Sequence, residues 1–373
     1  MFSFSQITVS QVYNQLEDLD TKKAIGHDGI TAKVLKLSRA PIAPILANIF
    51  NKSIQSCKFP HHLKKAIINP VFKKSDHFNK KNYRPLSILC MVSKIFEKII
   101  DRDMTDIKGH ILLPEVSAYR SNYSCQCVIL HALELWRKAL EDKKQVAIAL
   151  IDLSKAFESI SHPLLIAKLN AYGFSPNAVK FMASYLCRRL QRVKLQSIFS
   201  DWKSVVNGVP QGSVLGPTLF NIFINDLFWF IQDCTLSNFA DDNTLTAVGN
   251  TLQEVKDKLT TELVKTMEWF KMNHMAPNFS KFQFMLLGNH EDGEVNIEVQ
   301  GHSINNTDVV KLLGVKIDAK LSFDAHVSEI CKKVSAQLSV LIRFKRILDI
   351  PAKLSTLKSF IMTSQSESNR QQI

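Results

Sequence analysis

Two adjacent aspartates stand in the middle of a segment that otherwise favours β-structure. Asp241 and Asp242 lie between residues 235–237 and residues 245–248, which are apolar or β-prone. This arrangement predicts a short β-hairpin whose tight turn carries both carboxylates. Two negative charges on one turn repel each other unless a cation lies between them, and carboxylate oxygen is a preferred ligand of Mg²⁺. The alternative is a solvated Asp-Asp-Asn turn, because Asp and Asn are ordinary turn residues.

A third carboxylate follows an apolar run earlier in the chain. Residues 146–151 are small or branched apolar residues between polar flanks, and Asp152 comes directly after them. Such a run is typical of a strand buried on both faces, which would hold Asp152 at a rigid strand end. Three carboxylates on two neighbouring strands are able to hold two metal ions about 4 Å apart, an arrangement that stabilises both the attacking and the leaving oxygens in phosphoryl transfer. Taken alone, Asp152 fits equally well as a strand-end residue that caps the next loop.

The charge of the chain points to a polyanionic partner. The formal net charge is +13, and the excess is local. Residues 52–84 contain nine Lys or Arg and one acid, residues 332–358 contain seven and one, and residues 180–203 contain six and one. Three solvated faces would explain these stretches separately. Together with an acidic metal candidate, they favour a groove for a nucleic-acid backbone.

The pattern of apolar residues predicts an α+β fold. Helical spacing indicates helices over residues 31–56, 91–107, 128–140 and 325–347, and β-patterns indicate strands over residues 66–72, 282–287, 295–299 and 310–317. Helices and strands are mixed rather than strictly alternating. Residues 363–373 are predicted to be a polar, frayed tail.

The sequence predicts an intracellular protein that is neither secreted nor membrane-spanning. Residues 1–6 lack the basic and apolar segments of a secretory signal. No stretch approaches the ~18 apolar residues of a spanning helix. The seven cysteines are scattered without a Cys-x-x-Cys pair, which favours a reduced compartment.

Residues 207–217 form a Gly- and Pro-rich loop around Gln211, directly before an apolar helix. The loop alone is weak evidence for a ligand site, although its backbone is suited to approach a flat ligand closely. In order along the chain, DLSKAF (152–157), GVPQGSVLGP (208–217) and FADD (239–242) resemble the palm of a reverse transcriptase, and more narrowly that of non-LTR (LINE-type, jockey-like) retrotransposons. Further segments resemble other motifs of that family: residues 22–30 its entry motif, 82–87 and 93–97 its fingers, 278–281 its late palm, and 312–315 and 321–323 its turn into the thumb.

The resemblance implies a right-hand polymerase of fingers, palm and thumb, with an antiparallel palm sheet that carries the catalytic carboxylates. Residues 1–140 would be the fingers with an N-terminal extension, residues 141–290 the palm, and residues 291–373 the end of the palm and a partial thumb. The implied activity is that of an RNA-directed DNA polymerase. Its partners would be an RNA template, a DNA primer and deoxynucleoside triphosphates, with two Mg²⁺ or Mn²⁺ ions, in the nucleus or the cytoplasm.

The resemblance also implies roles for individual residues. Asp152 and Asp241 would be the primary metal ligands, with Asp242 as an adjacent acid. Lys281 would protonate the leaving pyrophosphate, and its alternative is a surface lysine. Phe157 would crowd a ribose 2′-hydroxyl and so favour deoxynucleotides, although on its own it fits a core phenylalanine better.

The remaining implied contacts are to the incoming nucleotide. Gln211 and Gly212 would line the incoming base or the template. Lys74 and Arg84 would bind the triphosphate, since arginine can fork two phosphate oxygens whereas lysine acts as a point charge.

The chain departs from the family at several positions. Glu158 stands where the family commonly has Asp, His27 where it usually has Pro, and Phe279 and Phe282 replace the usual Pro and Thr around Lys281. The chain begins close to the polymerase motifs and ends soon after the first thumb helices. A second hypothesis is therefore a truncated or co-opted fragment that binds nucleic acid without polymerising. A palm-type nucleotide cyclase would share the carboxylates but would not explain the loop at Gln211.

Overall fold

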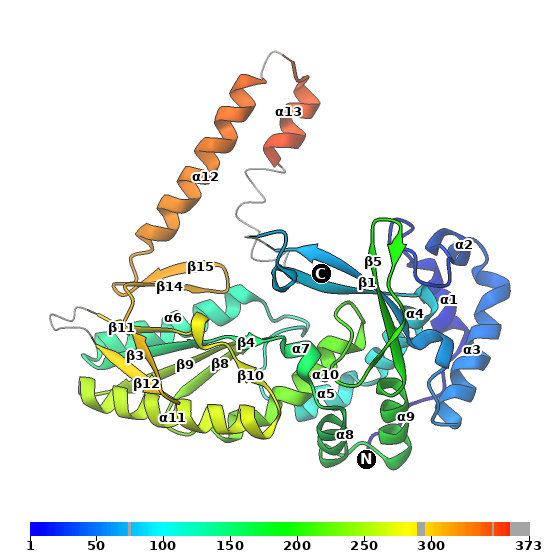
Figure 1. Ribbon diagram of the computed structural model, residues 1–373, viewed down its shortest axis with the longest axis horizontal. Helices are drawn as coiled ribbons and strands as arrows, with labels where there is room; N and C mark the ends of the chain where they lie inside the picture. Colours follow the sequence, from blue (N-terminus) through cyan, green and yellow to red (C-terminus); the bar gives the residue numbers. More distant parts are fainter. Residues whose placement is uncertain (74–75, 289–294, 345–346, 359–373) are drawn as a thin grey trace. The chain divides into compact units, whose positions relative to one another are not determined.

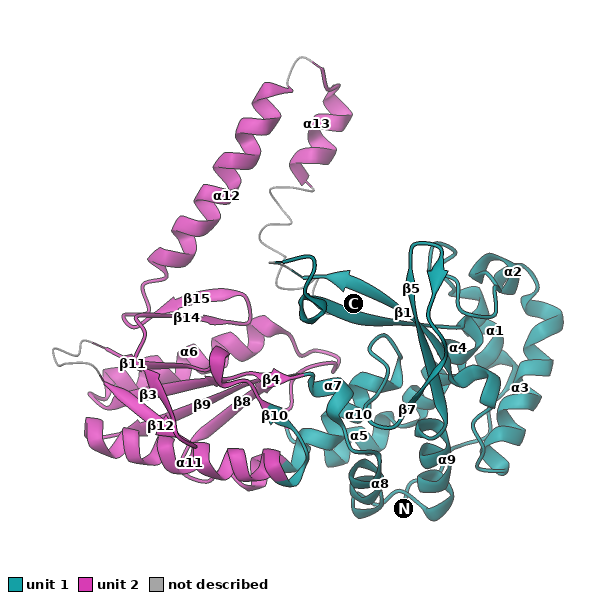
Figure 2. Ribbon diagram, viewed as in Figure 1, with its two compact units in different colours: residues 1–113, 155–226, 272–276 teal, residues 114–154, 227–271, 277–373 magenta. Residues whose placement is uncertain are grey.

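The computed structural model describes residues 1–73, 76–288, 295–344 and 347–358. The tail predicted over residues 363–373 lies outside these residues. The chain forms two compact units, each built from several stretches of sequence (Figure 2). Unit 1 contains residues 1–113, 155–226 and 272–276, and unit 2 contains residues 114–154, 227–271 and 277–373. Both units combine helices and strands (Figure 1), which confirms the predicted α+β class. In the described part of the chain no helix is long and apolar enough to span a membrane.

Unit 1 is organised around a five-stranded mixed sheet. Its strand order is β2-β1-β5-β6, and β7 also pairs with β5. The strand β1 runs antiparallel to β2 and parallel to β5. The strands are β1 (Lys65–Phe72), β2 (Tyr83–Leu89), β5 (Arg189–Leu195), β6 (Ile198–Phe199) and β7 (Lys203–Val205).

The helices of unit 1 enclose an aromatic core in which Phe50 and Phe96 stack with ring centroids 4.2 Å apart. The single helix predicted over residues 31–56 is wrong: two helices meet at Ser38, whose ψ of 17° departs from helical geometry. The helix predicted over residues 91–107 likewise divides at Met104. The helices are α1 (Val9–Glu17), α2 (Ala32–Leu37), α3 (Arg39–Gln55), α4 (Met91–Asp103), α5 (Thr105–Ile111), α7 (Ala156–Ser159), α8 (His162–Ala171), α9 (Pro176–Leu186) and α10 (Leu215–Ile224), with short 3₁₀ turns η1 (His61–Lys64), η2 (Lys80–Asn82) and η3 (Asn225–Trp229).

Unit 2 is organised around a four-stranded antiparallel sheet in the order β11-β3-β9-β8. The strand β3 (Gln145–Ile151) is buried along nearly its whole length, which confirms the strand predicted to be covered on both faces. The helix α6 (Cys125–Glu141) packs on one face, where Trp136 donates a hydrogen bond to the Thr246 hydroxyl at 3.0 Å. Figure 1 shows α11 (Leu252–Met272) on the side of the sheet away from α6. The other strands are β8 (Thr235–Phe239), β9 (Asp242–Gly249) and β11 (Gln283–Leu287).

The last part of unit 2 consists of two hairpins and two helices. The single strand predicted over residues 310–317 is wrong: Leu313 and Gly314 both adopt positive φ and turn the chain into a hairpin. The helix predicted over residues 325–347 is present as α12, which ends at Arg343. The elements are β12 (Asn296–Val299), β13 (His302–Asn305), β14 (Val309–Leu312), β15 (Val315–Asp318), α12 (Asp324–Arg343) and α13 (Ile350–Leu357), preceded by the short β4 (Leu153–Ser154), β10 (Ala276–Pro277) and η4 (Phe279–Lys281).

Candidate active site

The acidic pair lies on the predicted β-hairpin. The strands β8 and β9 pair antiparallel, and Phe239 opposite Asp242 closes the hairpin around a two-residue turn of Ala240 and Asp241. Ala240 adopts φ 54°, a left-handed backbone conformation that residues other than glycine rarely take. Asp241 therefore sits in the turn itself, whereas Asp242 is the first residue of β9. The predicted hairpin is confirmed, with one of the two acids in the strand rather than in the turn.

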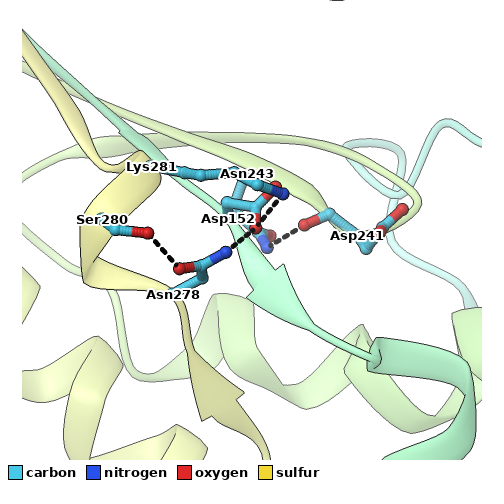
Figure 3. A network of polar contacts seen from close by, with 6 residues as sticks. All are labelled: Asp152, Asp241, Asn243, Asn278, Ser280 and Lys281. Carbon is cyan, nitrogen blue, oxygen red and sulfur yellow. Dashed lines mark hydrogen bonds and ion pairs between the residues drawn. The ribbon is translucent and has the colours of Figure 1, made fainter. Parts of the chain in front are cut away.

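Two buried asparagines hold this turn from beneath. Asn238 and Asn243 face each other across the hairpin and are almost completely buried. The Asn238 amide donates to the Asn243 side-chain oxygen at 2.9 Å and to the Ala240 carbonyl at 2.7 Å. The Asn243 amide donates to the Asp241 carbonyl at 3.2 Å (Figure 3). Both carbonyls of the turn thus have a buried donor, which offsets the cost of the left-handed residue.

Asp152 follows β3 and lies beside the acidic hairpin. The strand β3 pairs with β9, and Ile151 stands opposite Asn243. The Asp152 carboxylate accepts a hydrogen bond from the Asn278 side-chain amide at 3.1 Å, and its two oxygens lie 3.1 and 3.0 Å from Lys281 Nζ (Figure 3). The Asn278 backbone N–H also donates to the Asp152 carbonyl at 2.9 Å. The turn at η4 therefore fixes both the backbone and the side chain of Asp152.

One pocket of about 190 Å³ brings part of the predicted site together. Asp152, Asp242 and Lys281 line it, along with Gln283 and Lys311. Asp241 is not among its lining residues. Across the described residues, no three His, Cys, Asp or Glu side chains are grouped closely enough to hold a metal ion. Asp152 and Asp242 nevertheless fit a hard divalent cation in donor type, because Mg²⁺ and Mn²⁺ prefer carboxylate oxygen, and they share one opening.

The other predicted residues that the structure describes belong to unit 1. Phe157 lies in the short helix α7, where its ring stacks on Phe220 with centroids 4.6 Å apart. It is half-buried, so its packing accounts for one face of the ring. Arg84 lies in β2, is exposed, and pairs with Val71 of β1. Lys74 lies outside the described residues.

The loop that contains Gln211 and Gly212 is fixed along its length. The Gly208 carbonyl lies 2.7 Å from Nε2 of the buried His162, and the Ser87 backbone N–H donates to the Gln211 carbonyl at 2.6 Å. Gly212 has φ 106°, and a Cβ there would lie 2.7 Å from the Ser87 carbonyl oxygen. Only glycine fits this approach to β2. Gly212 thus allows the loop to pack closely on β2, and the approach of the loop to a flat ligand stays a prediction.

A fully buried carboxylate anchors the end of the same loop. Glu97 of α4 accepts hydrogen bonds from the backbone N–H groups of Val214 and Leu215 at 2.7 and 3.3 Å, at the start of α10. Ser93 donates to its other oxygen at 3.1 Å. Burial raises the pKa of Glu97, whereas the nearby Arg189 and these hydrogen bonds lower it. A carboxylate at a helix N-terminus also benefits from the helix dipole.

Sequence reasoning missed the residues that support the site. Glu97 and Asn278 stood inside recognised motifs without an assigned role, and His162 and the pair Asn238 and Asn243 were not singled out as supports. A partial signal exists for Glu97, because Ser93 and Glu97 lie one turn apart on the apolar face of an amphipathic helix. Glu97 and Val214, and Asn278 and Asp152, are more than 100 residues apart in sequence, so no local pattern reveals these contacts.

Comparisons with known proteins give one consistent result. The profile of the family described as "Reverse transcriptase (RNA-dependent DNA polymerase)" matches residues 71–317. The chain is 26% identical over 370 residues to the "RNA-directed DNA polymerase from mobile element jockey" of Drosophila melanogaster, covering 96% of this chain and 40% of that protein. It is 27% identical over 362 residues to the "Probable RNA-directed DNA polymerase from transposon BS" of the same organism, covering 93% and 40%.

A comparison with solved structures finds similarity to an apo telomerase from Candida tropicalis truncated from its C-terminal domain. The TM-score is 0.47 and the sequence identity 13%, over 70% of this chain and 54% of that chain. The chain spans about two fifths of the length of the two transposon relatives.

Proposed function

The chain belongs to the reverse transcriptase (RNA-dependent DNA polymerase) family, and on that premise we propose that it extends a primer on an RNA template by two-metal nucleotidyl transfer. The observation that carries this proposal is the convergence of Asp152 and Asp242 on one pocket at the ends of paired antiparallel strands. A rigid sheet that presents carboxylates from two adjacent strands is suited to phosphoryl transfer, in which positioning and charge stabilisation dominate.

The carboxylates of unit 2 are proposed to hold the cations of the reaction. Asp152 and Asp241 act as the primary ligands and Asp242 as an adjacent acid, for two Mg²⁺ or Mn²⁺ ions. Bound there, such ions stabilise the charge on the attacking and leaving oxygens. The primer 3′-hydroxyl attacks the α-phosphate of the deoxynucleotide, and pyrophosphate leaves. Asn278 and the asparagine pair beneath the turn keep the carboxylates in place during this step.

Lys281 is proposed to act as the proton donor to the leaving pyrophosphate. Its ammonium group is mostly exposed and lies 3.0 Å from Asp152, so it stands beside the metal ligands. Phe279 and Phe282 on either side of it pack against each other, with centroids 4.9 Å apart. This contact supports a fixed position for η4 despite the departure from the family sequence.

The residues of unit 1 are proposed to bind the incoming nucleotide. Phe157 crowds the 2′ position of the sugar, Gln211 and Gly212 line the base or the template, and Lys74 and Arg84 bind the triphosphate. The half-buried Phe157 ring and the rigid loop at Gln211 support these roles. Residues 1–140 then correspond to fingers with an N-terminal extension, residues 141–290 to the palm, and residues 291–373 to the end of the palm and a partial thumb.

The proposed partners are an RNA template, a DNA primer and deoxynucleoside triphosphates. The net charge of +13 supports a nucleic-acid partner of this kind. A reverse transcriptase of this type would act inside the cell, in the nucleus or the cytoplasm.

Primer extension on an RNA template tests the proposal. The purified chain is expected to add deoxynucleotides in Mg²⁺ or Mn²⁺, and Asp241→Asn is expected to abolish the addition while leaving primer–template binding intact. Asp257→Asn is the matched control, because Asp257 is an exposed carboxylate on α11 and does not line the pocket of Asp152 and Asp242. Binding without nucleotide addition in either metal would contradict the polymerase proposal and support a fragment that only binds nucleic acid.

A further inference from the structure

An unpaired arginine lies among aromatic rings on the sheet of unit 1. The Arg192 guanidinium carbon lies 4.0 Å from the centroid of the Phe199 ring and 4.6 Å from that of the Trp202 ring. Within the described part of the chain, the Arg192 side chain makes no hydrogen bond and no ion pair, and its Nε is buried without a partner. A guanidinium carries five N–H donors in a planar fork. The Arg192 guanidinium thus packs against two aromatic rings, whereas its N–H groups have no acceptor in the described part of the chain.

Further cations lie on the same face of this sheet. Side chains two residues apart on a strand share a face, so Arg192 and Lys194 of β5 point the same way. Lys65 of β1 is in register with Leu190, which places it on that face as well. The ammonium groups of Lys65 and Lys194 lie 5.5 and 5.6 Å from the centroids of Trp202 and Phe199. None of these three cations forms an ion pair with an acid of the described residues.

These positive charges also act on the pKa of a neighbouring histidine. The ring of His27 lies 6.1 Å from that of Trp202. Burial lowers the pKa of His27, Asp28 raises it, and the positive charges of Lys65 and Arg192 lower it further. Asp28 is thus the one acid that acts on His27, and it is outnumbered by the cations Lys65 and Arg192. The surface is electropositive at the point where the aromatic rings hold Arg192.

We propose that Arg192, supported by Phe199 and Trp202 and flanked by Lys65 and Lys194, binds a backbone phosphate of a nucleic-acid strand. The rings fix the plane of the guanidinium by cation–π contact, which leaves its N–H edges to donate to an anion. A phosphodiester meets this need, because two of its oxygens accept a forked pair of hydrogen bonds. The proposal rests on the proposed function for the kind of strand, but it assigns a binding contact outside the residues proposed for chemistry.

The salt dependence of binding tests this contact directly. The affinity for an RNA–DNA primer–template is measured at several salt concentrations in a metal chelator without nucleotides, so that no catalysis enters. Each phosphate contact contributes about 0.7–0.9 to the slope of log affinity against log salt. Arg192→Gln is expected to reduce the slope by about that amount and to weaken binding about tenfold at a fixed salt concentration near 0.1 M.

Two further variants separate this contact from general charge. Lys203→Gln removes one exposed cation from the same sheet, but Lys203 is in register with Gln191 and therefore points to the opposite face. It is expected to change the slope by much less than Arg192→Gln. Arg192→Lys keeps the charge and loses the fork, so it should retain most of the slope while binding more weakly. Melting temperatures establish that each variant is folded.

Equal slopes for Arg192→Gln and Lys203→Gln would overturn the proposal, as would an unchanged slope for a folded Arg192→Gln. A loss of binding to polyglutamate in Arg192→Gln, with nucleic-acid binding unchanged, would also overturn it and would indicate an acidic protein partner. Failure of the polymerase proposal gives a different result: no nucleotide is added in the extension assay, while the salt slopes keep the expected order.

Discussion

Truncation of Glu97 is expected to release the loop around Gln211 without unfolding the chain. In Glu97→Ala the backbone N–H groups of Val214 and Leu215 lose their acceptor, and the buried Arg189 loses the negative charge that acts on it. Each orphaned buried donor costs about 1–3 kcal/mol, and two donors are orphaned here. Partial entry of water into the loop would relieve some of this cost. We therefore expect the free energy of local opening to fall by about 3 kcal/mol.

Hydrogen exchange followed by mass spectrometry measures this opening. A change of about 3 kcal/mol corresponds to exchange about a hundredfold faster in peptides covering residues 205–220. Peptides from β3 and β9 of unit 2 should exchange at unchanged rates. The same variant should raise the KM for deoxynucleotides more than it lowers kcat, because the loop carries the proposed nucleotide contact at Gln211.

Two variants make the test specific. Glu97→Gln keeps an oxygen for the Val214 N–H and a nitrogen that can donate to Ser93, so its exchange should rise by less than about tenfold. Glu17→Ala removes an exposed carboxylate of α1 and should leave residues 205–220 unaffected. The reasoning would be refuted by unchanged exchange in Glu97→Ala, or by equal effects of the alanine and glutamine substitutions.

Two other supports of the site give testable effects. Burial lowers the pKa of His162, the hydrogen bond to Gly208 opposes this effect and Arg189 adds to it, so the folded pKa lies below the ordinary value of 6.5. Neutral His162 therefore contributes fully to the free energy of unfolding above pH 6.5, and this contribution is lost as the pH falls through the folded pKa. Below pH 6.5, the denaturation midpoint should consequently decline less steeply with falling pH in His162→Gln than in the native chain. Asn243→Ala removes the donor to the Asp241 carbonyl and the acceptor of Asn238, at a cost of about 1–3 kcal/mol. Direct titration of Asn243→Ala with Mn²⁺ should then show weaker binding, and the primer-extension assay should show a lower kcat. The control Asn250→Ala, in an exposed turn, should match the native chain in both assays. Unchanged Mn²⁺ affinity in a folded Asn243→Ala would contradict a positioning role for the asparagine pair.

The parts of the fold that follow from the sequence are those set by local pattern. The apolar run before Asp152 is a buried strand, and the β-prone flanks of Asp241 and Asp242 form a hairpin. The resemblance to reverse transcriptases of jockey-like elements is confirmed by the family match and by the jockey and BS relatives. These predictions succeed because alternation, turn chemistry and short motifs are each contained within a few neighbouring residues.

The errors and omissions have a common physical origin in backbone geometry and long-range contact. The helix over residues 31–56 breaks at Ser38, and the strand over residues 310–317 turns at Leu313 and Gly314, although the apolar pattern continues through both points. The pattern of apolar residues alone cannot reveal a single residue with non-helical ψ or positive φ. The ion pair between Lys281 and Asp152 joins residues 129 positions apart, so its existence depends on the register of the sheet and not on either local sequence.

Buried polar groups hold the predicted site residues in place within each of the two units. In unit 2 the acidic turn rests on Asn238 and Asn243, and Asp152 is tied to Asn278. In unit 1 the loop at Gln211 is tied to Ser87, His162 and Glu97. A buried hydrogen bond adds little net free energy to folding, but a buried polar group without a partner is costly. These groups therefore mainly fix the local geometry in each unit and add little to its stability. Each network therefore restrains the local geometry of its own unit, the carboxylates in unit 2 and the loop in unit 1.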